Sequence, residues 1–234
     1  MIDDARSLRP FPLHALALAG VAAALSATVP LDRMFALLPG PAPARGAWML
    51  ALALSGLFFA AKAGFRTVPY DLKRPMVVAV AIALPLAVGL VLVDTTAPRS
   101  ILLPDFIDAF RATPLLVRLQ YFAVRAFGED VAYRLFLVSL LAFAGASLLR
   151  RGQGRIPESV YWAAIVASSI IDVGLNCWLY VPLTPAIWIY TLVRLVLPGV
   201  LWGYLYWRHG FVTATAAHLA THLFYQPLMT LVLG

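Results

Sequence analysis

Apolar segments of close to 20 residues recur along the whole chain, and they constrain its fold more than any other feature. They cover residues 12–29, 46–61, 76–93, 131–149, 159–178, 186–206 and 211–232. A helix needs about 20 apolar residues to cross the hydrocarbon core of a bilayer. The ten-residue alternating strands of an outer-membrane barrel are absent from the sequence. The pattern therefore predicts an all-α fold, a polytopic transmembrane helical bundle.

The composition excludes an ordinary soluble domain. Hydrophobic residues make up 62% of the chain and charged residues 12%, whereas a soluble domain has about 45–50% and 25%. The net charge of +7 would suggest nucleic acid in a soluble protein, but here the basic residues lie in short loops that set membrane orientation. We expect a lipid bilayer environment, no nucleic-acid partner, and a multi-pass protein of the inner (plasma) membrane. The rich use of Ala, Leu and Arg suggests a bacterial genome.

The number of spans depends on residues 101–128, where Arg111, Arg118 and Arg125 recur every seven residues and share one helical face. An amphipathic interfacial helix fits this pattern and gives seven spans, with the polar residues facing the extracytoplasmic side. An additional span with snorkelling arginines gives eight spans and the cytoplasmic side. We expect one membrane domain over residues 1–234, with accessory spans at 1–100 and a core bundle at 129–234.

Charged residues interrupt the apolar sequence at Glu129, Asp130 and Arg134. Charges at membrane depth are costly and usually functional. Asp130 and Arg134 are four residues apart, the spacing of an ion pair on one helix face. We expect a helix to begin here and Glu129 to lack a partner on its own helix, which would leave it free for proton transfer. A simple acidic helix start is the alternative.

Two polar stripes follow on later helices. Ser168, Asp172 and Asn176 are spaced by four residues and share one face of an apolar helix. Hydrogen bonding between membrane helices is their alternative explanation. His218 and His222 are also four apart, so both can point into one polar cavity or share a metal.

Depth connects these features. Arg194 is a lone cation within its span and needs an acid, for which we expect Asp172. Counting 1.5 Å per residue, His222 lies about 17 Å into the membrane, in the same half as Glu129 and Asn176. The sequence therefore predicts that Glu129, Asn176 and His222 lie at one level.

These motifs resemble those of the CPBP family of intramembrane proteases, the CAAX-protease and bacteriocin-processing group also called Abi. The family's E-E-x-x-x-R is similar to the sequence at 129–134, its F-x-x-x-H resembles residues 168–176, and its H-x-x-x-N resembles residues 218–222 after the stretch 203–210. The resemblance covers residues 115–230. Asp172 stands in place of the family's aromatic residue, Asn176 in place of its His, and His222 in place of its final Asn.

The resemblance implies hydrolysis of a peptide bond in a membrane protein or peptide substrate. Glu129 would be the general base that activates water. His218 and His222 would orient the water or protonate the leaving amine, and Asn176 would donate a hydrogen bond to the oxyanion. Asp130, Arg134, Asp172 and Arg194 would support these residues.

The sequence also allows a metal-dependent site and two functions without catalysis. We expect no cofactor, although zinc is possible, with Glu129, His218 and His222 as three ligands and one open position. A catalytically inactive scaffold or immunity-type protein of the same fold is the main alternative function. A proton-coupled transporter is a third, but the two halves of the chain show no repeat symmetry.

Overall fold

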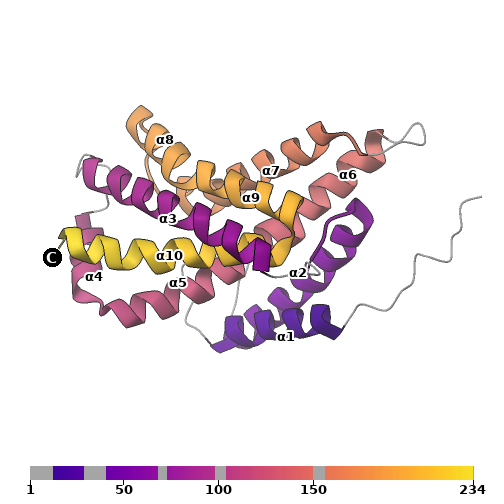
Figure 1. The fold of residues 1–234 in the computed structure, drawn as a ribbon, viewed down its shortest axis with the longest axis horizontal. Coiled ribbons are helices and arrows are strands. Elements are labelled where there is room, and N and C mark those ends of the chain that lie inside the picture. Colours follow the sequence, from indigo (N-terminus) through magenta and orange to yellow (C-terminus); the bar gives the residue numbers. More distant parts are fainter. Residues whose placement is uncertain (1–12, 29–40, 68–72, 98–103, 150–155, 234) are drawn as a thin grey trace, which may run out of the picture.

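The protein is described by a computed structural model that covers residues 13–28, 41–67, 73–97, 104–149 and 156–233. Within these ranges every regular element is a helix (Figure 1). The predicted all-α fold is therefore confirmed.

The helix bounds agree with the predicted segments to within a few residues, except at 131–149, where the observed helix already begins at Leu115. The α-helices are α1 (Leu13–Thr28), α2 (Ala42–Ala63), α3 (Lys73–Thr96), α4 (Pro104–Ala112), α5 (Leu115–Glu129), α6 (Ser139–Leu149), α7 (Glu158–Val173), α8 (Pro185–Thr191), α9 (Leu197–His209) and α10 (Phe211–Leu233). Three π-helical segments join some of them: η2 (Asp130–Val138), η3 (Gly174–Trp178) and η4 (Leu192–Val196). The basic loop at 150–155 lies outside the described residues.

Five helices in the described ranges are long and apolar enough to cross a membrane: 42–63, 75–96, 115–149, 158–178 and 185–209. α1 is apolar but shorter, and α10 has the length, at 23 residues, but carries Thr, His and Gln side chains. The chain is therefore a helical membrane protein, while the number of spans, seven or eight, stays a prediction.

The expected helix start at Glu129 is wrong. Residues 115–149 form one helix without interruption, because Asp130, which follows α5, keeps right-handed helical backbone angles. Glu129 and Asp130 therefore lie in the middle of a long helix, where an acidic helix start cannot explain them. The structure does not distinguish the interfacial helix from the additional span. The predicted single helical face for Arg111, Arg118 and Arg125 is wrong, because α4 ends at Ala112 and α5 begins at Leu115. Arg118 is buried and donates a hydrogen bond to Thr230 of α10.

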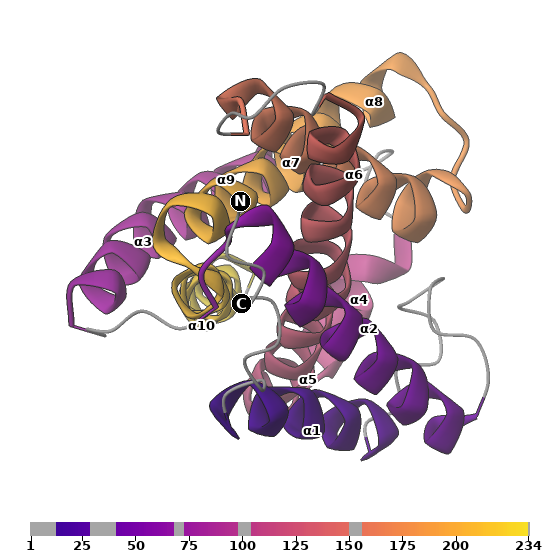
Figure 2. The same cartoon turned by 90° about the vertical axis from the view of Figure 1, so that its right-hand side faces the viewer.

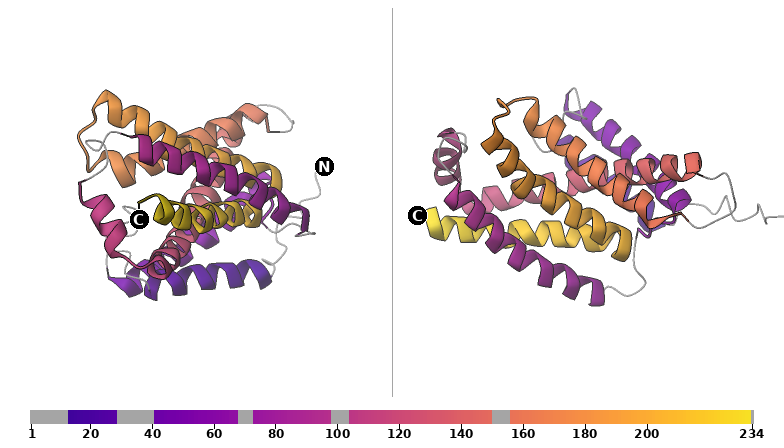
Figure 3. Two further views of the ribbon diagram at one scale, coloured as in Figure 1. Left: turned by 60° about the vertical axis from the view of Figure 1, so that its left-hand side comes forward. Right: turned by 90° about the horizontal axis from the view of Figure 1, so that it is seen from above.

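α10 is the central helix of the bundle. It packs against α3, α5, α9 and η2, and it runs through the middle of the molecule with α3 and α5 on either side (Figure 1). Seen from above, α3 and α9 lie along α10 (Figure 3). α1 packs on α2 at the periphery (Figure 2). A polar stripe on α10 is thus surrounded by other helices.

Two close helix contacts bring the polar segments together. A Cβ at Gly56 of α2 would lie 2.9 Å from the backbone of Leu135, so only glycine lets α2 approach η2 this closely. Gly199 and Gly203 of α9 face Ser169 and Ile165 of α7, and a Cβ at Gly203 would lie 2.6 Å from Ile165. This is the small-xxx-small packing typical of membrane helices.

Candidate active site

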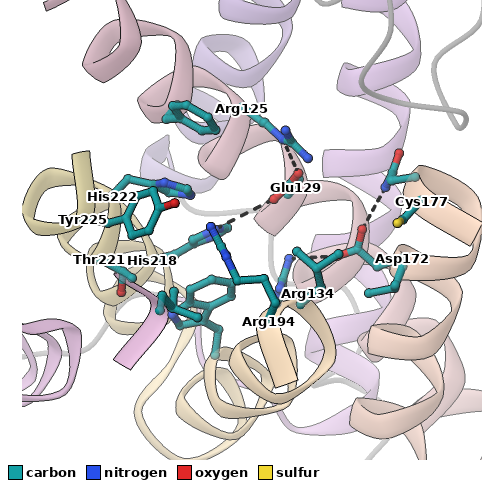
Figure 4. A pocket seen from close by; sticks show the side chains of 16 residues that line it. Arg125, Glu129, Arg134, Asp172, Cys177, Arg194, His218, Thr221, His222 and Tyr225 are labelled. Atoms are coloured by element: carbon teal, nitrogen blue, oxygen red, sulfur yellow. Dashed lines mark hydrogen bonds and ion pairs between the residues drawn. The ribbon is translucent and has the colours of Figure 1, made fainter. Parts of the chain in front are cut away.

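A cavity of about 140 Å³ lies inside the bundle. Its polar lining comes from helices that are far apart in sequence: Glu129, Arg134, Asp172, Asn176, His218 and His222 (Figure 4). All three π-helical segments contribute to its wall. π-helical turns are rare and frequently occur at functional sites. The predicted convergence of Glu129, Asn176 and His222 is therefore observed.

The two oxygens of Glu129 face different partners. Arg125 Nε donates to Oε1 at 2.6 Å, so the expectation that Glu129 has no partner on its own helix is wrong. Oε2 points to Nε2 of His218 at 3.8 Å (Figure 4). That distance is too long for a direct hydrogen bond. The ion pair with Arg125 thus fixes the carboxylate so that one oxygen faces the cavity and His218.

His218 is held by Asp130. Nδ1 of His218 lies 3.1 Å from Oδ1 of Asp130, and both side chains are almost completely buried. The imidazole ring also stacks on Trp202, with the ring centroids 3.6 Å apart. An acid at Nδ1 fixes the ring orientation and directs Nε2 toward the cavity. Asp130 therefore positions a histidine, rather than bracing a helix start.

Arg134 joins two acids. Its Nε lies 3.5 Å from Asp130, as the four-residue spacing predicts, and its Nη1 lies 3.6 Å from Asp172 of α7 (Figure 4). Both distances exceed those of a normal charge-assisted hydrogen bond. Within the described residues, Nη1 of Arg134 and Oδ2 of Asp130 are buried with no hydrogen-bond partner. The charged groups of this cluster thus lie close together but leave some of their hydrogen-bond donors and acceptors unpaired.

Asn176 is already engaged as a donor. Its Nδ2 donates to Asp172 at 2.8 Å and to the hydroxyl of Tyr133 at 2.7 Å. An amide group has two N–H donors, so one of these bonds must be exchanged before Asn176 can donate to an oxyanion. Ser168 Oγ donates to the carbonyl oxygen of Tyr133 in η2. The polar stripe on α7 therefore also provides a hydrogen bond to a backbone carbonyl group of η2 across the helix interface.

His222 lies at the far wall of the cavity. Its ring stacks on Phe122, with centroids 4.8 Å apart, and lies 5.2 Å from the ring of His218. Nδ1 is buried, and no hydrogen-bond partner for it exists in the described part of the chain. Both histidines thus point into one cavity, as their spacing predicts.

Arg194 pairs with a different acid from the one expected. Its Nε donates to both oxygens of Asp94 at 2.8 Å, so the predicted pair with Asp172 is wrong. Tyr190 and Tyr225 donate to the same carboxylate at 2.7 and 2.5 Å. α3 therefore contributes Asp94 to this buried cluster, one residue beyond the predicted apolar segment 76–93.

A zinc ion held by Glu129, His218 and His222 stays a prediction. Within the described ranges no three His, Cys, Asp or Glu side chains are arranged to hold a metal. Oε1 of Glu129 is bound to Arg125, so only its Oε2 faces the cavity, 3.8 Å from Nε2 of His218. Arg125, Arg134 and Arg194 also line the cavity, and their charge opposes a cation.

The sequence contained signals for two of the residues that were missed. Arg125 and Glu129 have the four-residue spacing of a helical ion pair. Asp94 is a lone acid near the end of an apolar helix, where an unpaired charge needs a partner. Tyr133 and Trp202, which contact Asn176 and His218, have no comparable signal, because an aromatic residue is ordinary in a membrane helix.

No protein-family model matches the chain, and comparisons with curated proteins and with solved structures also find no match. The similarity to CPBP proteases therefore rests on the motifs at 129–134, 168–176 and 218–222 alone.

Proposed function

We propose that the protein is an intramembrane endopeptidase related to the CPBP group, with Glu129 and His218 at its reaction centre. One observation carries the proposal. Oε2 of Glu129 faces Nε2 of His218 across a buried cavity, and Asp130 lies within hydrogen-bond distance of Nδ1 of the same histidine. An acid, an oriented imidazole and an enclosed space form a set that can activate water.

The reaction would begin with a water held between Oε2 of Glu129 and Nε2 of His218. The cavity of about 140 Å³ exceeds the space that one water needs. As the water oxygen attacks the carbonyl carbon, Glu129 takes a water proton. The C–N bond then breaks, and protonated Glu129 passes its proton to the leaving nitrogen, directly or through Nε2 of His218, which gives a carboxyl group and an amine.

Charge on the oxyanion would be stabilised by a cation that lines the cavity. Arg134 lies on its wall and its Nη1 has no hydrogen-bond partner among the described residues, and fixed positive charge in an enclosed site lowers the energy of a developing anion. His222, with an unpartnered Nδ1, would supply a hydrogen bond to the substrate. The substrate would be a membrane-anchored or exported protein or peptide at a bacterial inner membrane.

A non-enzymatic membrane scaffold is the second candidate, and one observation favours it. The three arginines on the cavity wall each lie within 4 Å of an acid: Arg125 near Glu129, Arg134 near Asp130 and Asp172, and Arg194 near Asp94. Such pairing also serves a purely structural polar core.

Co-expression with neighbouring single-pass membrane proteins as candidate substrates distinguishes the two. Proteolysis predicts a shorter substrate band with the wild type, and its loss with Glu129→Gln and His218→Ala while both variants remain in the membrane. The matched control is Glu158→Gln, because Glu158 is exposed on α7 far from the cavity lining. Equal processing by Glu129→Gln and the wild type would refute the assignment of Glu129.

A further inference from the structure

A second, larger chamber adjoins the reaction cavity. Its volume is about 310 Å³, within the range of ligand pockets. The two cavities share wall residues, among them Phe122, Arg194 and His222. Apolar side chains such as Phe110 and Ile187 form much of the remaining wall. The chamber is thus a mostly apolar extension of the proposed site.

One buried amide in this chamber has no partner. Gln226 is 1% exposed, and neither its Nε2 nor its Oε1 forms a hydrogen bond with any described residue. It lines the chamber. Buried polar groups in native proteins are nearly always hydrogen-bonded, and an exception calls for an explanation. A ligand that offers both a donor and an acceptor would satisfy this side chain.

The position of Gln226 on α10 sets its distance along the helix from the reaction cavity. His218, His222 and Gln226 follow at four-residue spacing, so they share one helix face. His218 lines the first cavity, Gln226 lines the second and His222 lines both. Gln226 lies about 12 Å along the helix from His218. An extended peptide covers this distance in three to four residues.

We propose that Gln226 binds the backbone N–H and C=O of one substrate residue, three to four residues from the scissile bond. Its Nε2 donates to the carbonyl oxygen of that residue and its Oε1 accepts from the N–H of the same residue, because these two groups point to the same side of an extended chain. The apolar chamber takes the flanking apolar side chains of an extended segment. The identity of this ligand rests on the proposed peptide hydrolysis.

The test uses full-length protein with Glu129→Gln, which removes turnover, purified in detergent. The probe is an acetylated, amidated heptapeptide of leucine and alanine with a photoreactive leucine, together with versions in which one amide is replaced by an ester. We expect Gln226→Leu to weaken peptide capture about tenfold. The matched control Gln120→Leu, at an exposed position of α5, leaves capture unchanged. At one position of the replaced amide, the ester peptide is captured more weakly than the all-amide peptide by the Glu129→Gln protein. The protein that also carries Gln226→Leu captures these two peptides equally.

Thermal unfolding separates binding from structure. Gln226→Leu removes an unpaired buried amide, so its midpoint stays equal to that of the parent or rises, whereas a structural glutamine would lower it when replaced. Equal capture by both proteins, no capture by either, or a lowered midpoint overturns the proposal. If peptide binds through Gln226 but the wild type cleaves nothing, the proposed hydrolysis fails and this assignment stands. If the wild type and Gln226→Leu cleave with equal KM, the assignment fails and the hydrolysis stands.

Discussion

Two buried charge clusters lie next to each other in this bundle and differ in how completely their groups are paired. Around Asp94, three donors occupy both carboxylate oxygens at 2.5–2.8 Å. In the second cluster, Glu129 lies 3.8 Å from His218 and Asp130 lies 3.5 Å from Arg134, and Oδ2 of Asp130 has no hydrogen-bond partner in the described ranges.

The difference indicates different roles. A saturated cluster joins helices, and the Asp94 cluster joins α3 with η4 and α10 through Arg194 and Tyr225. An unsaturated cluster retains donors and acceptors for another molecule, and the one around Asp130 faces a cavity. Buried polar groups that lack partners are rare in native proteins. We therefore interpret the first cluster as structural and the second as functional.

Asp94→Asn is expected to have the largest effect on stability. It leaves Arg194 buried without its counter-ion, and breaking a buried pair in this way costs about 3–5 kcal/mol. Chemical unfolding in detergent measures the loss. Asp108→Asn is the control, because Asp108 is exposed on α4. A loss below about 1 kcal/mol, the range of surface pairs, would contradict a structural role for the Asp94 cluster.

Asp130→Asn should reduce substrate processing about 100-fold, because His218 loses the acid that orients it. Because Asp130 is only loosely paired with Arg134, we expect a smaller loss of unfolding free energy than for Asp94→Asn. Rates of substrate processing and unfolding curves on the same preparations test both statements. A variant as active as the wild type would remove Asp130 from the site.

Tyr190→Phe tests the saturated cluster on a smaller scale. Removing one hydroxyl that donates to Asp94 should lower the free energy of unfolding by about 1 kcal/mol. Tyr204→Phe is the matched control, because no hydrogen bond of its hydroxyl is found among the described residues. Equal stability of the two variants would show that the hydroxyl of Tyr190 does not stabilise the Asp94 cluster.

His222→Phe should have the smallest effect on stability. It keeps an aromatic ring against Phe122 and removes a buried nitrogen that has no partner within the described residues, so the free energy of unfolding should change by less than about 1 kcal/mol. Processing should fall, because the substrate loses a donor. A strongly destabilised His222→Phe would show that this histidine is structural.

The helices could be predicted from the sequence, but the pairing of charges could not. Apolar length located most of the helices, and helical rise predicted that Glu129, Asn176 and His222 lie close together, as they do around the cavity. The partner of Arg194 was wrong because sequence lists the acids without their distances, and Asp94 belongs to a helix 100 residues away. The break expected at Glu129 was wrong because a change from amphipathic to apolar composition can occur within one continuous helix. The π-helical segments, and the satisfied carbonyl of Tyr133, depend on tertiary packing.

The most direct measurement follows purified wild type and Glu129→Gln on one identified substrate in water enriched in ¹⁸O, with unfolding curves recorded for both. If Glu129 activates water, the wild type produces a new carboxyl terminus that contains one ¹⁸O atom. Glu129→Gln then loses at least 100-fold in rate while it remains folded. A Glu129→Gln protein that cleaves at the wild-type rate and incorporates ¹⁸O equally would contradict the central claim.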